Sequence, residues 1–437
     1  MNAAAGQACD RLVRELQRDH RVPAVSAAVY RADRAPWAVA AGAPAVTTDT
    51  VFRIGSITKT FTAVLVLQAR DAGLLDLDDP LSAHLAVPAH GDATIRRLLS
   101  HTAGLQREPY GDLWDTLDMP SADRLVADLA RAEAVLPPGR RWHYSNLAYA
   151  LLGHLTAARF GGTWEEVLHA RLLGPLGLTR TGVLPHAPVA QGYLVDAYSD
   201  VARPEPHTDF RGVGPAAQLW STAADLARWA RFLVTPDPAV LDPATAEEMR
   251  RPVTVTDPDE WHTGWGLGLI LVPRGGRVVH VGHSGAMPGF LAGAFARRDG
   301  AVGAAVLGSS GTAGETTVLP HALIEASLVH DPPDVVPWIP GDPPPAELAP
   351  VLGRWWSEGF EFVFRWRDGH LEARATEAPA NRAPAVFAVE SGDVLRTVSG
   401  REAGEQLRLT RDGAGRVVRM HWATYRLTRD QQTFGTP

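Results

Sequence analysis

The sequence predicts an α/β (α+β) protein of two domains, in which a mixed sheet carries an inserted helical lobe and a small antiparallel β domain follows. Three observations predict this fold class. Strand-like segments occur at both ends of residues 1–333, helix-like segments fill the middle, and a proline-rich stretch precedes a last strand-rich region. At 437 residues, the chain also exceeds the length at which a single hydrophobic core stops growing.

The first domain is predicted over residues 1–333. Residues 24–42 read as a hairpin of small and β-branched residues, and residues 316–329 read as a closing helix. Four later strands are predicted at 266–272, 277–283, 289–297 and 301–308. Because strands occur at both ends of the domain, we expect one sheet to join them, with the helices of residues 57 to about 240 inserted as a lobe.

A linker is predicted over residues 334–346. Seven prolines fall between residues 331 and 345, which excludes an internal helix or strand and indicates a stiff spacer. After it, polar and apolar residues alternate around an Asp368-Gly369 turn, as in a hairpin. We therefore expect residues 347–437 to form a small antiparallel β domain, a barrel or half-barrel, with Trp355 and Trp356 in its core.

The composition excludes several classes of partner. Hydrophobic residues make up 45% and charged residues 21%, as in a soluble globular protein. A net charge of −7 without a basic stripe argues against nucleic acid as a partner. The longest apolar run, residues 63–67, is too short for a bilayer, and the N-terminus lacks a signal-peptide pattern. Cys9 is the only cysteine. We expect a cytoplasmic protein that neither enters a membrane nor forms an intrachain disulfide.

The stretch FRIGSITKTF, residues 52–61, holds the only lysine among 42 basic residues. The helix that starts near Ile57 is apolar on every side, which predicts a buried central helix. Ser56 lies at its start and Lys59 three residues later, on the same face. A desolvated amine can take the proton of a serine hydroxyl, which a guanidinium cannot do. The alternative is that Ser56 only caps the helix and Lys59 is a surface charge.

Two further motifs follow in order. WHYSNLAYALLG places Tyr144 and Asn146 at the head of another apolar helix, and VVHVGHSGAMPGF ends a strand in His283-Ser284-Gly285. The order Ser-x-x-Lys, Tyr-x-Asn, His-x-Gly resembles the serine β-lactamase and penicillin-binding-protein superfamily over roughly residues 10–330. Tyr-x-Asn resembles the branch with class C β-lactamases, D-aminopeptidases, family VIII-type esterases and penicillin-binding-protein-type thioesterases. The resemblance implies a β-lactamase/DD-peptidase-like sheet and helical lobe.

The resemblance also implies residue roles. Ser56 would be the acylated nucleophile, and Lys59 and Tyr144 would transfer its proton. The backbone N–H groups of Ser56 and Ala286 would form the oxyanion hole. Six residues are expected to bind the substrate: Asn146, His283, Ser284, Gly285, Ala286 and Trp220. Asn146 would hydrogen-bond the substrate's amide. Trp220 either walls the acyl pocket or simply packs.

Four further residues, His280, His283, Ser284 and His101, have alternative interpretations. His280 and His283 do not suggest a metal site, because residues three apart on a strand point to opposite faces. Ser284 lacks the full G-x-S-x-G pattern of a nucleophile elbow. His101 is expected to be a hydrogen-bonded structural histidine that lines the pocket. We expect neither a metal nor a cofactor.

One departure from the family pattern bears on the substrate. Class C β-lactamases usually carry Lys-Thr-Gly where this chain has His283-Ser284-Gly285, and a histidine is mostly neutral at pH 7. Efficient β-lactam hydrolysis is therefore not expected. Esters, thioesters and D-residue peptides are better candidates.

The expected function is that of a serine acyl-transfer enzyme with a small-molecule or peptidyl (thio)ester substrate. A narrower alternative is a stand-alone thioesterase that cyclises and releases nonribosomal peptides. Such cyclases combine this catalytic domain with a lipocalin-like C-terminal domain, and a carrier protein of a peptide synthetase would then be a partner. Further alternatives are a D-aminopeptidase, a DD-carboxypeptidase, a weak β-lactamase, and a non-catalytic binding or sensor protein. The last is disfavoured because Ser56, Lys59 and Tyr144 are all present.

Overall fold

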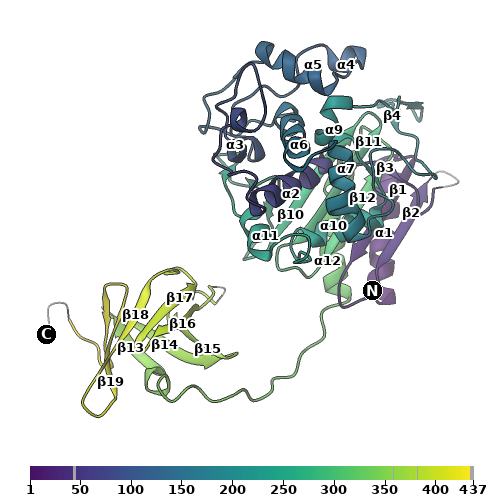
Figure 1. Ribbon diagram of the computed structural model, residues 1–437. Coiled ribbons are helices and arrows are strands. Elements are labelled where there is room, and N and C mark those ends of the chain that lie inside the picture. The colour runs from purple at the N-terminus through teal and green to yellow at the C-terminus, as the bar shows by residue number, and fades with distance from the viewer. Residues whose placement is uncertain (43–45, 358, 381, 434–437) are drawn as a thin grey trace. The chain divides into compact units, whose positions relative to one another are not determined.

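The computed structural model separates into two compact units, Met1–Pro333 and Asp334–Pro437. Two clusters of buried hydrophobic residues stabilise the first unit and one stabilises the second, and Figure 1 shows the helices and strands of both units. The structure describes residues 1–42, 46–357, 359–380 and 382–433.

The first unit contains a sheet of eight strands. In spatial order they are β2 (Trp37–Gly42), β1 (Ala24–Tyr30), β12 (Gly303–Gly308), β11 (Phe290–Arg297), β10 (Val279–Met287), β9 (Ile270–Pro273), β8 (Gly264–Trp265) and β7 (Thr254–Val255). The purple N-terminal hairpin pairs with β12, with Val25 opposite Gly308, so one sheet does join both ends of the unit (Figure 1). The predicted fold class is confirmed. The sheet is antiparallel rather than mixed in its described pairs, because tight turns join successive strands as hairpins, as between Met287 and Phe290.

Helices cover both faces of this sheet. On one face, α1 (Ala3–Asp19) and α12 (Leu319–His330) share a core with β1, β11 and β12. On the other face lie α2 (Thr58–Asp71), α6 (Asn146–Phe160) and α10 (Ala223–Phe232), which belong to the larger core. The closing helix predicted at 316–329 is α12, preceded by a 3-10 turn.

The remaining elements of the first unit are short. The helices are α3 (Ile95–Leu99), α4 (Leu113–Thr116), α5 (Ala122–Ala127), α7 (Trp164–Leu168), α8 (Gly174–Leu176), α9 (Gly214–Ala217), α11 (Pro243–Met249) and a π-helical turn, His169–Leu173. The 3-10 turns are Gly55–Ile57, Leu81–Ala83, Asp128–Arg131, Arg211–Val213 and Gly314–Thr317. Two strand pairs stand apart from the large sheet: β3 (Phe52–Arg53) with β6 (Trp220–Ser221), and β4 (Tyr193–Val195) with β5 (Ala202–Pro204).

Helix α2 is the buried central helix that the sequence predicts. Its residues from Thr58 through Leu67 are all buried, and it packs against α6 and α9. Buried polar groups need hydrogen-bond partners, and the hydroxyls of this helix have them. Thr60 donates to the carbonyl of Ile57, and Thr62 donates to the carbonyl of Pro215. These hydrogen bonds fix the buried hydroxyl groups of Thr60 and Thr62 in position.

The second unit is an antiparallel barrel. Its strands are β13 (Gly353–Ser357), β14 (Phe360–Arg367), β15 (His370–Ala375), β16 (Ala385–Ser391), β17 (Val394–Ser399), β18 (Gln406–Arg411), β19 (Val417–Trp422) and β20 (Tyr425–Leu427), after a 3-10 turn at Ala349–Val351. Paired backbone hydrogen bonds between Trp356 and Thr428 join the first strand to the end of the last. Trp355 lies in the core as predicted, whereas Trp356 is only partly buried because alternate residues of a strand face opposite sides.

The proline-rich stretch from 333 to 345 contains no helix or strand, and Trp338 within it is 84% exposed. Within the described parts of the chain, no helix combines the length and apolar character that crossing a bilayer requires.

Candidate active site

Ser56 lies in the 3-10 turn Gly55–Ile57, immediately before α2. This turn packs directly on β10. A Cβ atom at Gly55, whose φ is +50°, would lie 2.7 Å from the Ala286 nitrogen, and one at Gly285 would lie 1.9 Å from the Ile54 oxygen. Only glycine fits at either position. The two glycines thus bring the backbone at Ser56 and at Ala286 close together, as a shared oxyanion hole requires.

Lys59 is fully buried and holds the centre of the site. Its Nζ atom lies 3.1 Å from Ser56 Oγ, and it donates to Asn146 Oδ1 at 2.7 Å and to the Ala216 carbonyl at 2.9 Å. The last two contacts fix the amine, while the first is short enough for direct proton transfer from the hydroxyl. The structure therefore brings together the serine and the lysine of the first motif.

The pKa of Lys59 is lowered to about 7, because burial lowers it strongly, the Glu108 charge offsets part of this effect, and the Arg107 charge adds to it. Burial disfavours the charged ammonium because the interior solvates it poorly. Near neutral pH, Lys59 is therefore present in both protonation states and can accept and return a proton. An arginine at this position would remain charged.

Tyr144 precedes α6, and its side chain is half-buried in the site. The centroid of the Tyr144 ring lies 4.4 Å from that of the His101 ring and 4.9 Å from Lys59 Nζ. Burial raises the pKa of the phenol well above its usual value, although a hydrogen bond with Ser56 partly offsets this rise. Tyr144 is therefore a neutral phenol that hydrogen-bonds Ser56, while Lys59 is the group that titrates near neutrality.

Asn146, the first residue of α6, is engaged on both sides of its amide. Its Oδ1 accepts from Lys59, and its Nδ2 donates to Glu108 Oε1 at 2.6 Å. These partners fix which way the amide points. The predicted contact of Asn146 with a substrate amide stays a prediction, and what the structure shows is a link from Lys59 through Asn146 to a carboxylate.

Glu108 is a functional residue that the sequence analysis missed. It lies shortly after His101 in the chain, and burial raises the pKa of its carboxyl while the hydrogen bond from Asn146 lowers it. Its neighbour Arg107 lies 3.6 Å away and also faces the Tyr144 ring. The only sequence signal for Glu108 was its position close to His101. Its negative charge faces Lys59 and opposes the effect of burial on the amine.

His283 lies on β10 and is 2% exposed. Its Nδ1 contacts the Ser284 carbonyl, so Nδ1 carries the proton and Nε2 is a bare acceptor. No described group bonds Nε2. Burial, followed by the Lys59 charge, lowers the pKa of His283 to about 3. His283 is therefore neutral and offers no cation to a substrate.

The comparisons with known proteins agree with this geometry. A family model described as Beta-lactamase matches residues 9–327. The chain belongs to the β-lactamase family. A second model, described as a domain of unknown function, matches residues 344–429, which cover the barrel.

Relatives of this β-lactamase-family chain include penicillin-binding protein 4 of Amycolatopsis lactamdurans, 35% identical over 79% of this chain and 96% of the relative. The crystal structure of SurE with D-Leu is 30% identical, covers 98% of this chain and 100% of that one, and has a TM-score of 0.60. The crystal structure of a D-stereospecific amidohydrolase from Streptomyces sp. is 28% identical, covers 75% of this chain and 98% of that one, and has a TM-score of 0.63. The predicted superfamily is confirmed, and the chain is a serine hydrolase of the β-lactamase and penicillin-binding-protein type.

The remaining residues predicted for this β-lactamase-family site lie around it. Ser284 is half-buried and Ala286 exposed on β10. Trp220 is 2% exposed and packs between Arg53, His207 and Phe290, which favours the packing role over a wall of the acyl pocket. The structural role predicted for His101 is confirmed, because its Nδ1 accepts from the Ser145 backbone at 3.0 Å.

His280 and His283 point to opposite faces of β10, as predicted. His280 Nδ1 lies 2.9 Å from Nδ1 of His321 on α12, whereas the His283 ring faces Trp265 and Tyr144. The two histidines of the β-lactamase-family motif therefore cannot share one ion.

Replacing Glu108 with glutamine is expected to shift the acid limb of the pH–rate profile to lower pH. The Glu108 charge raises the pKa of Lys59, so its removal lets burial lower that pKa further. Glutamine still accepts from Asn146. The measurement is the rate of acylation by an activated ester across pH. The exposed Glu133, changed to glutamine, is the control and should leave the limb in place. A shift to higher pH would contradict the assignment.

Replacing His283 with lysine is expected to speed acylation by carboxylate-bearing β-lactams about 10- to 100-fold. A charge-assisted hydrogen bond typically contributes about 1.5–3 kcal/mol. The rate should be measured with a penicillin above the pKa of Lys59, so that the base is neutral. His283→Gln, which adds no charge, is the matched control. Equal labelling of the two variants would show that position 283 does not face the substrate carboxylate.

Proposed function

We propose that the protein is a serine acyl-transfer enzyme that takes an acyl group from an ester, thioester or amide onto Ser56 and passes it to water or to an amine. The observation that carries this proposal is the contact of Ser56 Oγ with a buried Lys59 whose pKa is about 7. A serine hydroxyl needs such a base to become a nucleophile. The non-catalytic alternative has no use for an amine whose pKa is lowered in this way.

In the first step, neutral Lys59 accepts the Ser56 proton as Oγ attacks the substrate carbonyl. The backbone N–H groups of Ser56 and Ala286 stabilise the oxyanion that forms. The phenol of Tyr144, hydrogen-bonded to Ser56, passes a proton to the leaving group and is reprotonated from Lys59. In the second step, water or an amine attacks the acyl-serine and gives up its proton through the same pair, and Ser56 regains its hydroxyl hydrogen.

The state of His283 supports a substrate without a carboxylate next to the scissile bond. A neutral ring with a bare Nε2 attracts hydrogen-bond donors and not anions. Esters, thioesters and amides with a neutral flank suit this site better than β-lactams or the substrates of a DD-carboxypeptidase. Two relatives, SurE with D-Leu and a D-stereospecific amidohydrolase, support a D-configured acyl residue.

The narrower form of the proposal is a thioesterase that releases peptides by cyclisation. It is supported by the architecture of the chain, in which a β-lactamase-family unit is followed by an antiparallel barrel. A carrier protein of a peptide synthetase would then deliver the thioester. In such a reaction the peptide's own amine competes with water, and its attack benefits from being intramolecular.

The test uses a peptidyl thioester mimic with a D-configured C-terminal residue and a free N-terminal amine. Mass spectrometry of the products separates cyclic peptide from linear acid. The N-acetylated mimic cannot cyclise, and the mimic with an L-configured C-terminal residue tests stereospecificity. Cyclic product from the mimic with the free N-terminal amine supports the cyclase. Linear acid from both this mimic and the N-acetylated mimic, together with turnover of simple esters, supports a general hydrolase. If no mimic or ester turns over, the acyl-transfer proposal fails.

A further inference from the structure

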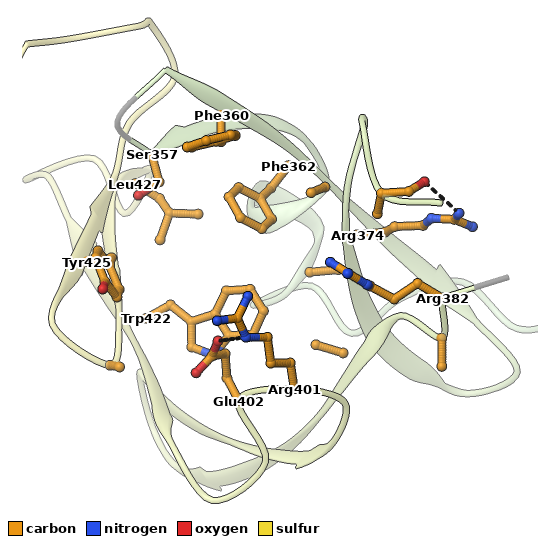
Figure 2. A pocket seen from close by; sticks show the side chains of 16 residues that line it. Ser357, Phe360, Phe362, Arg374, Arg382, Arg401, Glu402, Trp422, Tyr425 and Leu427 are labelled. Carbon is orange, nitrogen blue, oxygen red and sulfur yellow. Dashed lines mark hydrogen bonds and ion pairs between the residues drawn. The ribbon is translucent and has the colours of Figure 1, made fainter. Parts of the chain in front are cut away.

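A cavity of about 410 Å³ opens at one end of the barrel in the second unit (Figure 2). Its walls come from the last residues of β13, β15 and β19, the first residues of β14, β16 and β20, and the loops that follow β15 and β17. In an antiparallel barrel these strand ends all meet at the same end. The cavity is therefore the mouth of the barrel.

Small side chains keep this mouth open. Ala373, Ala375 and Ala385 occupy lining positions on β15 and β16, where larger apolar residues would close the space. Small barrels usually fill their interior with side chains. The opposite end follows that rule, because Leu348 and Val351 enter the core there and Arg411, at the far end of β18, donates to the Glu347 carbonyl. The cavity is thus confined to one end.

The walls are apolar and aromatic. Trp422 forms part of the floor, with its indole N–H donating to Thr397 Oγ1 at 2.9 Å, so that its polar atom already has a partner. Phe362 projects from the opposite wall, with its ring centroid 5.8 Å from that of Trp422. At the rim, Phe360 is 59% and Tyr425 56% exposed. Exposed aromatic rings gathered around a cavity mark a surface that binds an apolar molecule.

The charge at the mouth is positive. Three arginines and one glutamate line it: Arg374, Arg382, Arg401 and Glu402. Arg374 is held by the carbonyls of Ala378 and Pro379, and Arg401 pairs with Glu402 at 3.5 Å. Within the described residues, the Arg382 side chain has no hydrogen-bond or ion-pair partner. Figure 2 shows it extending toward Phe362 and Trp422, while Arg374 points away.

We propose that the barrel mouth binds a small molecule with an apolar body and a carboxylate. The apolar body lies against Phe362 and Trp422, and the carboxylate lies at the rim, where Arg382 and Arg401 can reach it. A guanidinium donates two parallel hydrogen bonds to a carboxylate, which makes arginine well suited to this contact. This site is separate from Ser56 and its chemistry, and the proposal does not depend on the proposed function.

The test is isothermal titration calorimetry of the full chain with decanoate and with decylammonium, both below the concentrations at which they form micelles. The two probes share an apolar chain and differ in the sign of their charge. Decanoate should bind saturably, and decylammonium about tenfold more weakly or not at all. Arg382→Gln with Arg401→Gln should weaken decanoate binding about tenfold or more, because charge-assisted hydrogen bonds are lost.

Two further variants serve as controls for the binding measurement. Arg365 lies exposed on β14, at a position that alternates with Phe360 and Phe362 and so faces away from the cavity, and Arg365→Gln should bind decanoate like wild type. Ala375→Trp fills the mouth and should abolish binding, with thermal unfolding checked for an intact barrel. Equal affinity for both probes, no saturable binding of decanoate, or full binding by the filled variant would overturn the proposal.

Discussion

Replacing Ser56 with alanine is expected to abolish covalent labelling of the protein and to lower turnover by a factor on the order of 10⁴ to 10⁶. Ser56 Oγ is the hydroxyl that Lys59 Nζ reaches, and Tyr144 hydrogen-bonds the same side chain. Without it, the acyl group has no acceptor in the site. The measurement is intact mass spectrometry after treatment with a fluorophosphonate or an activated ester, which should give one adduct on the wild-type chain.

Ser284 provides the matched control, because it is a second hydroxyl in the same motif region and is half-buried on β10. Ser284→Ala should keep the single adduct, which peptide mapping should assign to Ser56. An adduct that survives in Ser56→Ala would contradict the assignment of Ser56, and an adduct that maps to Ser284 would identify Ser284 as the nucleophile.

Replacing Lys59 with arginine is expected to cost about 10²- to 10⁴-fold in turnover, nearly as much as replacing it with alanine. Arginine keeps the positive charge but cannot release a proton. The pKa of Lys59 is lowered to about 7, and the neutral amine is the active form. Wild-type acylation should therefore rise with pH up to about 7 and level off above it, losing about tenfold per pH unit below.

The Arg variant should lose this acid limb together with its activity. Arg70→Lys, on the partly exposed last turn of the same helix, exchanges the same two residue types outside the site and should change little. If Lys59→Arg kept more than about a tenth of wild-type turnover, Lys59 would act only as a fixed charge.

The sequence carried enough information to locate the reacting groups because these groups follow from local spacing. Ser56 and Lys59 are three residues apart at a helix start, and this spacing alone puts them on one face. The single lysine among many arginines pointed to a need for a titratable amine. Tyr144 and Asn146, at the head of α6, were assigned instead from the resemblance of the Tyr-x-Asn pattern to the family motif.

Other features depend on contacts between distant segments and could not be found from spacing. Glu108 matters because Asn146 reaches it from α6, a contact that no local pattern encodes. The bare Nε2 of His283 results from its ring bonding to the Ser284 carbonyl, which depends on a rotamer and not on a motif. The barrel mouth was missed because alanines at inward positions look the same in the sequence whether or not larger residues fill the space around them.

The contact between β10 and the turn at Ser56 governs when the enzyme can first react during its own synthesis. Gly285 lies against Ile54, and β1 pairs with β12, so the surroundings of Ser56 include segments that leave the ribosome long after it. Closing so long a loop must precede these contacts. A nascent chain that ends before β12 therefore holds an unreactive serine. The barrel, whose neighbouring strands are consecutive in the chain, emerges after β12 and can fold once the nucleophile is in place.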